Sequence, residues 1–267
     1  MKATNLPLGR KTDYPQKYAP EVLCPVPRAQ AREALGLPEP LPFSGVDIWN
    51  AWELTWLDGK GLPQVATAQM TVPAASPHLV ESKSLKLYLG SFAMSRYEHA
   101  RALRATIASD LSFCAGAEVG VALDVRMPAG SLPGRCIDQL DAACDTWEVA
   151  PGLLAADQGE YVAESLHTHL LRSLCPVTGQ PDIGSLLVSY EGPRIDPGSL
   201  LRYIVSFRQH NDFHEACVER IFVDILARCG PDKLSVYARY QRRGGIDINP
   251  FRSNTGEVPQ NLRLWRQ

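Results

Sequence analysis

The chain has 267 residues, a formal net charge of −2, 45% hydrophobic residues and 21% charged residues. This composition is typical of a globular protein with a buried core, long enough for one large domain or two of ordinary size. The near-neutral charge gives no general attraction to nucleic acid, and no apolar run approaches the ~18 residues of a membrane span. We therefore expect no direct nucleic-acid partner and no membrane partner.

The N-terminal sequence and the cysteines both indicate the cytoplasm. The first residues, "MKATNLPLGRKTDYPQKYAPEVLCPVPR", lack the apolar core of a secretory signal. The chain has seven cysteines, an odd number, and none stands in a CxxC pair. That pattern favours reduced thiols over a disulfide framework, so we expect a cytoplasmic protein.

The predicted elements of the first half begin with a proline-rich stretch. Residues 1–42, with "LCPVPRAQ" and "GLPEPLPF", are expected to form an extended arm, with one short helix at "AREALGL". Residues 46–71 fit two strands around a turn at Asp58 and Gly59. "SLKLYLGSF" is expected as a strand, "RYEHARALRATIASDLSFCAG" as a helix that ends at its glycine, and "EVGVALDVRM" as a strand.

The second half follows a loop-rich segment over residues 127–160. It contains a strand at "LLVSYEG", a helix with a broken entry over "SLLRYIVSFRQHNDFHEACVERIFVDILARCG", and a strand with a basic glycine turn at "KLSVYARYQRRGGIDINP". The predicted domains are an N-terminal arm (1–42), a first module (43–135), a linker (136–160) and a second module (161–267).

The two halves resemble each other at a constant shift of 115 positions. This shift lays "SLKLYLGSF" on "SLLRYIVSF", His99 on His214 and Cys114 on Cys229 without a gap. Apolar periodicity alone makes amphipathic helices look alike, but a shift kept through several elements indicates a duplicated α+β unit. "ESKSLK" occurs only in the first half, and "LCPVTGQPD" and "FHEACVE" only in the second. If one site exists, we expect both halves to build it.

Cys175, in "LRSLCPVTGQPD", is a candidate nucleophile, a candidate metal ligand or a packing residue. A thiol attacks only as the thiolate, so it needs a proton acceptor, for which Asp182 and His214 are candidates. Gly179 and Pro181 suggest a tight loop that returns Asp182 toward the thiol. On local sequence alone, packing is the more frequent role of a free cysteine.

A second cluster of polar residues lies in "HNDFHEACVE". His210 and His214 share a helix face, but no third and fourth ligand stands at useful spacing and the pattern is not HExxH. The sequence therefore predicts no bound metal. The cluster fits either helix capping or recognition of a purine-like ligand, with His214 and Glu215 on its polar edge and Phe213 stacked on its ring.

Two basic segments are candidates for binding a phosphate-bearing cofactor. "ESKSLK" combines two lysines and two serines with Glu81, and "RYQRRGG" places Arg243 beside Gly244. Both segments fit an ordinary solvated surface equally well. No GxGxxG, Walker or GxSxG pattern is present, so a dinucleotide is not expected to bind in the Rossmann manner.

Taken together, "ESKSLKLY", "LCPVTGQPD", "FHEACVERI" and "YARYQRRGGIDINP" resemble the signatures of the NADPH-dependent 7-cyano-7-deazaguanine reductase family. The resemblance covers nearly the whole chain and includes the N-terminal arm of the long, two-module form. It implies an α+β fold of two tandem tunnelling-fold (T-fold) modules, with antiparallel sheets and helices packed on one face. It also implies NADPH as the cofactor and, with a composite site, a homodimer.

The resemblance further implies a reaction. Cys175 would attack the cyano carbon of 7-cyano-7-deazaguanine (preQ0) to form a covalent thioimide, and Asp182 would donate a proton. Two NADPH molecules would then give the aminomethyl product preQ1 for queuosine synthesis in tRNA. Residues implied in substrate binding are Val80, Glu81, Ser82, His214 and Glu215, and those implied in cofactor binding are Ser82, Lys83, Arg243 and Gly244.

Two other functions were weighed against this one. A pterin- or purine-handling enzyme of the cyclohydrolase type would need a zinc set of cysteines and a histidine, and the cysteines here lack the spacing for one. A non-catalytic module that binds a nucleobase or associates with RNA is the second alternative. The net charge of −2 argues against RNA.

Overall fold

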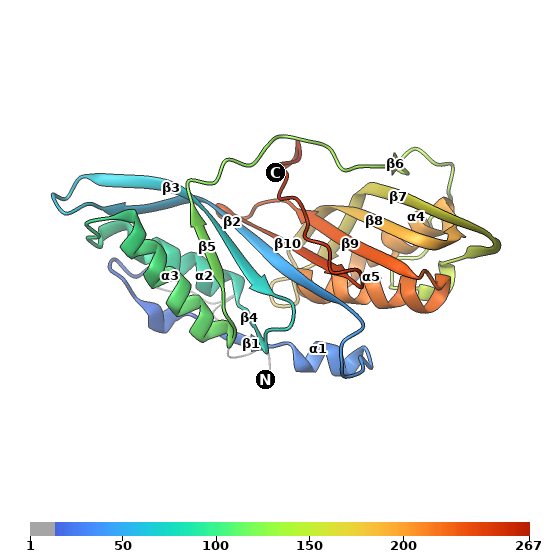
Figure 1. Ribbon diagram of the computed structural model, residues 1–267, viewed down its shortest axis with the longest axis horizontal. Coiled ribbons are helices and arrows are strands. Elements are labelled where there is room, and N and C mark those ends of the chain that lie inside the picture. Colours follow the sequence, from blue (N-terminus) through green and yellow to red (C-terminus); the bar gives the residue numbers. More distant parts are fainter. Residues whose placement is uncertain (1–13) are drawn as a thin grey trace. The chain divides into compact units, whose positions relative to one another are not determined.

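Two α+β units make up the computed structural model, which describes residues 14–267. Of these residues, unit 1 contains 14–33, 47–126 and 242–247, and unit 2 contains 34–46, 127–241 and 248–267. The predicted α+β class is confirmed in both units (Figure 1). The prediction for residues 1–13 of the arm lies outside the described residues.

Unit 1 contains a sheet in the order β5-β3-β2, formed by β2 (Ser44–Leu57), β3 (Pro63–Pro73) and β5 (Gly120–Leu123). The predicted turn between the first two strands is confirmed. Asp58 organises it, because its Oδ1 accepts the backbone N–H groups of Lys60 and Leu62, both at 2.9 Å. Alternating burial along β3 shows that one face of this sheet is covered.

The expected arm contributes three short elements to the structure. β1 (Pro25–Pro27) pairs antiparallel with β4 (His78–Val80), and η2 (Pro20–Val22) precedes it. The short helix predicted at "AREALGL" is confirmed as α1 (Ala29–Ala34). The segment Pro25–Pro27 is therefore tied to the body by backbone pairing.

The helical part of unit 1 corrects one prediction. "SLKLYLGSF" is not a strand but α2 (Ser82–Gly90) continued by η3 (Ser91–Met94). Leu85, Tyr88, Leu89 and Phe92 are all buried, and their spacing of three and four residues is that of one helix face. The next helix is confirmed as α3 (Ala100–Ala115), which ends at Gly116 with a left-handed φ of 69°.

Unit 2 contains strands in the order β10-β9-β8-β7-β6. They are β6 (Arg135–Cys136), β7 (Ala156–Leu174), β8 (Pro181–Ile195), β9 (Lys233–Tyr240) and β10 (Ile246–Ser253), most of which lies in this unit. All pairs from β7 to β10 are antiparallel, whereas β6 runs parallel to β7. β7 begins inside the segment expected as a linker. The sequence did not reveal this start, because the first residues of β7 are polar and exposed and carry no strand signal.

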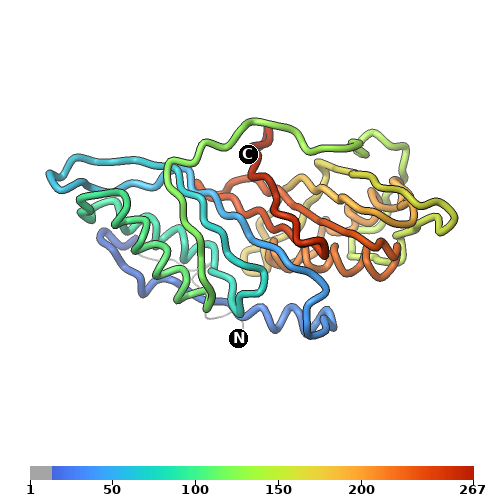
Figure 2. The backbone as a smooth tube through the Cα atoms, viewed as in Figure 1, coloured from blue at the N-terminus to red at the C-terminus, as the bar shows by residue number. Residues whose placement is uncertain are grey.

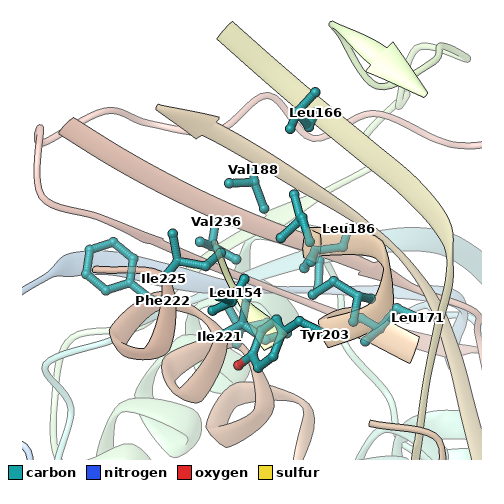
Figure 3. Packing of buried hydrophobic residues seen from close by; sticks show 14 of the residues in the cluster. Leu154, Leu166, Leu171, Leu186, Val188, Tyr203, Ile221, Phe222, Ile225 and Val236 are labelled. Atoms are coloured by element: carbon teal, nitrogen blue, oxygen red, sulfur yellow. The ribbon is translucent and has the colours of Figure 1, made fainter. Parts of the chain in front are cut away.

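The core of unit 2 forms between these strands and the helices α4 (Pro197–Val205) and α5 (His214–Cys229), which η5 (Ser206–Gln209) joins. α5 lies along the sheet below β8 and β9 in the view of Figure 1. Figure 3 shows Ile221, Phe222 and Ile225 of α5 near the strand residues Leu186 and Val236. Burying side chains of this size stabilises the unit by roughly 1.5–3 kcal/mol each.

The internal duplication is visible in matching hydrogen bonds. Tyr88 Oη donates to Asp110 Oδ2 at 2.6 Å in unit 1, and Tyr203 Oη donates to Asp224 Oδ2 at 2.6 Å in unit 2. α2 and α4 both have nine residues and begin 115 positions apart, but α3 and α5, of 16 residues each, begin 114 apart. Figure 2 shows the two helix pairs as matching coils, teal to green and orange. The ungapped shift is thus wrong by one residue from the long helix onward.

The duplication extends into the predicted arm and linker. The backbone N–H groups of Ala19 and Cys24 donate to Ser91 Oγ and Ser84 Oγ. In unit 2 those of Ala150 and Ala155 donate to the equivalent hydroxyls of Ser206 and Ser199. Parts of the expected arm and linker are therefore matched pieces of the two units, and the exact domain boundaries stay a prediction.

Candidate active site

Cys175 lies in the turn of the hairpin formed by β7 and β8. Its backbone N–H donates to the Gln180 carbonyl at 2.9 Å, and its own carbonyl accepts from Gly179 N–H at 2.9 Å. Asp182 lies opposite Ser173 in the strand register. Because side chains alternate along a strand, Cys175 and Asp182 belong to the same face of this hairpin as diagonal neighbours. The tight loop predicted between them is this turn.

The start of α5 lies beside the same hairpin. Leu174 N–H donates to the His210 carbonyl at 2.8 Å, and Asp212 N–H donates to the Leu174 carbonyl at 3.1 Å. His214, the first residue of α5, has its Nε2 atom 3.4 Å from Asp182 Oδ2. Both side chains are largely buried, so a proton on this imidazole would be held close to the carboxylate in a region of weak solvent screening.

Asp182 and His214 are surrounded by three residues that the sequence did not single out. The Tyr240 ring lies 3.9 Å from the His214 ring, centroid to centroid, at an interplanar angle of 33°. Burial raises the pKa of the Tyr240 hydroxyl well above its usual value, and the charges of Asp182 and Glu215 add to this. The phenol therefore keeps its proton and can act only as a neutral hydrogen-bonding group.

Cys217 and Ser173 are the other two residues around Asp182 and His214. Cys217 is fully buried, and burial raises the pKa of its thiol well above the usual value, with Asp212 and then Asp182 and Glu215 adding to the effect. It therefore remains a neutral thiol among the acids. Strand pairing explains why Ser173 and Tyr240 lie here: Ser173 pairs with Asp182, and Tyr240 pairs with Gly184. The sequence could not reveal these positions, because the register is known only once the fold is known.

Phe213 and Glu215 flank His214 at the N-terminus of α5. Phe213 is the N-cap residue and is half-buried, whereas Glu215 is 3% exposed. A carboxylate with so little exposure is held by partners rather than by water. The structure thus brings Cys175, Asp182, Phe213, His214 and Glu215 together within unit 2.

The remaining site candidates belong to unit 1. Val80 ends β4, and Glu81 caps α2, its two carboxylate oxygens accepting the N–H groups of Lys83 and Ser84, both at 2.8 Å. Glu81 is 1% exposed, while Ser82 and Lys83 are half-buried at the first turn of the helix. The cap fixes the Glu81 carboxylate in one orientation, and its Oε1 also accepts the Ser82 hydroxyl at 3.5 Å.

The basic glycine turn also belongs to unit 1 and lies against α2. Gly244 and Gly245 have φ angles of 59° and 80°, and a Cβ atom on Gly244 would lie 3.3 Å from Lys86 Cδ. Trp52 anchors the turn, because its backbone N–H donates to the Gly245 carbonyl at 2.9 Å and its indole N–H to Asp247 at 2.6 Å. Sequence patterns gave no signal for this role of Trp52.

This arrangement in unit 1 is chemically suited to an anionic phosphate group. The Glu81 carboxylate occupies the N-terminus of α2, so the helix end itself is not the anion site. The cationic side chains of Lys83 and Lys86, together with Arg243 beside the left-handed glycines, supply the charge and the close backbone approach that a phosphate needs.

Comparison with known proteins identifies the family. A family model described as the N-terminal part of nitrile reductase, 7-cyano-7-deazaguanine reductase, matches residues 14–123, and a model described as QueF-like protein matches residues 181–258. A NADPH-dependent 7-cyano-7-deazaguanine reductase of Burkholderia ambifaria is 53% identical over 274 residues, covering all of both chains. The chain belongs to this nitrile reductase family. Relatives of the same name from Burkholderia cenocepacia and Burkholderia pseudomallei are each 52% identical over their full length.

Membership confirms the family resemblance read from the four motifs, and with it the oxidoreductase class and the dependence on NADPH. Both matched segments contain motif residues, with Glu81 in the first and Asp182 in the second. No helix among residues 14–267 is long and apolar enough to cross a membrane. The comparisons do not assign roles to individual residues, so those roles stay predictions.

Proposed function

We propose that this chain reduces the nitrile of 7-cyano-7-deazaguanine to the aminomethyl group of 7-aminomethyl-7-deazaguanine, a step in the synthesis of queuosine for tRNA. The observation that carries this function is the full-length identity of 53% to a protein named NADPH-dependent 7-cyano-7-deazaguanine reductase. No observation favours a cyclohydrolase or a non-catalytic binding module.

The first chemical step is assigned to Cys175 and Asp182. The Cys175 thiolate adds to the electrophilic nitrile carbon, a C–S bond forms, and the C≡N bond becomes a C=N bond. Asp182 delivers the proton that the nitrile nitrogen needs, which gives a neutral thioimide. Support comes from the burial of both side chains and from their shared hairpin face.

NADPH, when bound, supplies hydride, and two molecules of it with two protons account for the four-electron reduction of nitrile to amine. The thiolate of Cys175 leaves after the first reduction, when the carbon becomes an imine. His214, 3.4 Å from Asp182, is the proposed route by which Asp182 regains its proton. The buried ring of Tyr240 and its buried surroundings exclude water that would otherwise hydrolyse the imine.

Recognition of the substrate is assigned to hydrogen-bond acceptors and one aromatic ring. The carboxylates of Glu81 and Glu215 accept from the ring and exocyclic N–H groups of the deazaguanine, since a guanine-like edge presents donors that only an acceptor satisfies. His214 binds the polar edge and Phe213 stacks on the ring face. Ser82 and the Val80 backbone complete the substrate contacts.

NADPH is assigned to Ser82, Lys83, Arg243 and Gly244. The fit of the cationic side chains and the glycine turn of unit 1 to phosphate supports this assignment. We also propose that the protein acts in the cytoplasm as a homodimer and does not bind nucleic acid directly. The unpaired state of all seven cysteines supports a reducing compartment.

The test is NADPH oxidation with 7-cyano-7-deazaguanine as the substrate. The wild type should oxidise two NADPH per substrate, and Cys175→Ala should oxidise none, because no thioimide forms. Without NADPH, the wild type should give an absorbance change from the covalent adduct that Cys175→Ala lacks. An adduct that survives in Cys175→Ala would remove Cys175 from the mechanism, and absence of NADPH oxidation by the wild type would overturn the function.

A further inference from the structure

A group of metal-ligating side chains lies away from the residues assigned to the reaction. Among residues 14–267, Cys136, His167 and His169 bring one ligand atom each to within 4.8 Å of one another. Cys136 ends the two-residue strand β6, which pairs parallel to β7, and it lies opposite His167 in the register. His167 and His169 lie two residues apart on β7, beside an irregularity of its pairing with β8, and their ring centroids are 5.4 Å apart. The sheet register, not sequence spacing, assembles this group.

The second ring nitrogen of each histidine already has a partner. His167 Nδ1 lies 2.9 Å from the Pro133 carbonyl oxygen. A carbonyl only accepts, so Nδ1 carries the proton and Nε2 keeps its lone pair. His169 Nδ1 lies 2.7 Å from Ser185 Oγ, which leaves its Nε2 for a ligand as well. Metal-binding histidines are oriented in this way by hydrogen bonds from the nitrogen that does not bind the metal.

The charges around the group favour a divalent cation. The Asp138 carboxylate accepts the backbone N–H of His169 through both oxygens at 3.1 Å and the Thr168 hydroxyl at 2.6 Å. Arg266 opposes this effect, because its Nη2 donates to the His169 carbonyl at 2.6 Å. The two negative charges of a Cys136 thiolate and the Asp138 carboxylate outweigh the one positive charge of Arg266.

We propose that Cys136, His167 and His169 bind a zinc-like divalent ion. One thiolate and two imidazoles are ligand types that zinc prefers. Tetrahedral zinc holds such ligand atoms roughly 3.3–3.6 Å apart, so the distances between the three ligand atoms need to shorten by about 1 Å. Cys136 releases its proton when the metal–sulfur bond forms. The exposed position of Cys136 leaves the fourth coordination position to a water molecule. The ion fastens β6 to β7, a pair of only two residues in register.

Cobalt(II) is the probe, because a thiolate bound to it gives a charge-transfer band and tetrahedral coordination gives visible d–d bands. Tag-free, full-length protein under anaerobic conditions should bind one Co²⁺ per chain with both signals, and Zn²⁺ should displace it. Cys136→Ser should lose the charge-transfer band. Ser185→Ala, which removes the hydroxyl partner of His169 and a 3.3 Å contact of Arg266 but none of the three ligands, should weaken Co²⁺ binding roughly 10–100-fold while keeping the band.

Two matched cysteine variants locate the bound thiolate. Cys144→Ser removes a half-buried thiol of the same unit that is outside the group, and Cys175→Ala removes the proposed nucleophile. Both should keep the charge-transfer band. Circular dichroism checks that Cys136→Ser is folded, and Cys136→Ala provides a second variant if it is not. The proposal is overturned if the wild type shows no thiolate band, or if the band persists in both Cys136 variants or disappears in Cys175→Ala.

Discussion

At the scale of single residues, the surroundings decide which cysteine can react. Cys175 and Cys217 are both buried, at 5% and 0% exposure. Cys217 lies on α5 among carboxylates, and burial raises its thiol pKa well above the usual value. Cys175 lies in a hairpin turn beside the N-terminus of α5. The sequence motif around Cys175 pointed to this difference only through the family resemblance.

Asp182→Asn tests the proposed proton donor. The amide has nearly the same shape as the carboxyl group but cannot transfer a proton, so NADPH oxidation should fall by about 10²–10⁴-fold. Binding of 7-cyano-7-deazaguanine to the enzyme without NADPH, measured by calorimetry in a Cys175→Ala background, should change little. Turnover equal to that of the wild type would exclude Asp182 from the reaction.

Differential alkylation tests the thiol environments. Iodoacetamide reacts with exposed thiolates, so the native protein, freed of metal by a chelator, should at pH 8 be labelled first at Cys136, which is exposed, and not at Cys217. The raised pKa means that Cys217 stays protonated at this pH and below it. Peptide mass spectrometry reads the order of labelling, and early labelling of Cys217 would show that its surroundings open in solution.

At the scale of elements, the duplication supplies controls within one molecule. Glu81 caps α2 through two backbone N–H groups, and Asp196 caps α4 through Ser199 N–H at 2.6 Å. The two caps are equivalent in the repeat, but only Glu81 is a proposed ligand of the substrate. Their comparison therefore separates helix capping from substrate binding.

Replacing each cap by alanine tests this separation. Glu81→Ala and Asp196→Ala should each lower the free energy of unfolding by about 1 kcal/mol, measured by urea denaturation, because each leaves N–H groups of a helix end without a partner. Only Glu81→Ala should also lose kcat/KM for 7-cyano-7-deazaguanine. Equal losses of activity in both variants would reduce Glu81 to a structural role.

A buried ion pair joins two elements of unit 2. Arg252 of β10 donates from Nε and Nη2 to Glu219 Oε1 of α5, at 3.0 and 2.8 Å, with both side chains buried. Arg252→Met should cost about 3–5 kcal/mol in urea denaturation, because it leaves a buried carboxylate without its cation. The control is Arg194→Met, which breaks an exposed pair with Glu160 and should cost no more than about 1 kcal/mol. A similar cost for both would contradict the role of burial.

At the scale of the whole molecule, the proposed homodimer can be measured directly. Light scattering coupled to size-exclusion chromatography should give twice the mass of one 267-residue chain at micromolar concentration. A monomer that reduces the nitrile would show that one chain suffices for the complete site.

The sequence by itself determined the family, the reaction class, the NADPH requirement and the presence of a duplication. These properties follow from contiguous motifs and from their order along the chain, which can be recognised without knowledge of the fold. It predicted α3, α5 and the strands β2, β3, β5, β8 and β9, but it missed the 19-residue strand β7 and took α2 for a strand because a short apolar segment fits both periods.

Only the tertiary structure decided which distant residues meet. The stacking of Tyr240 on His214, the anchoring of the glycine turn by Trp52 and the group of Cys136, His167 and His169 all depend on strand register and on helix packing. Register is set cooperatively by the whole sheet and its core, since a shift of one residue turns every side chain to the other face. No local pattern of residues contains that information.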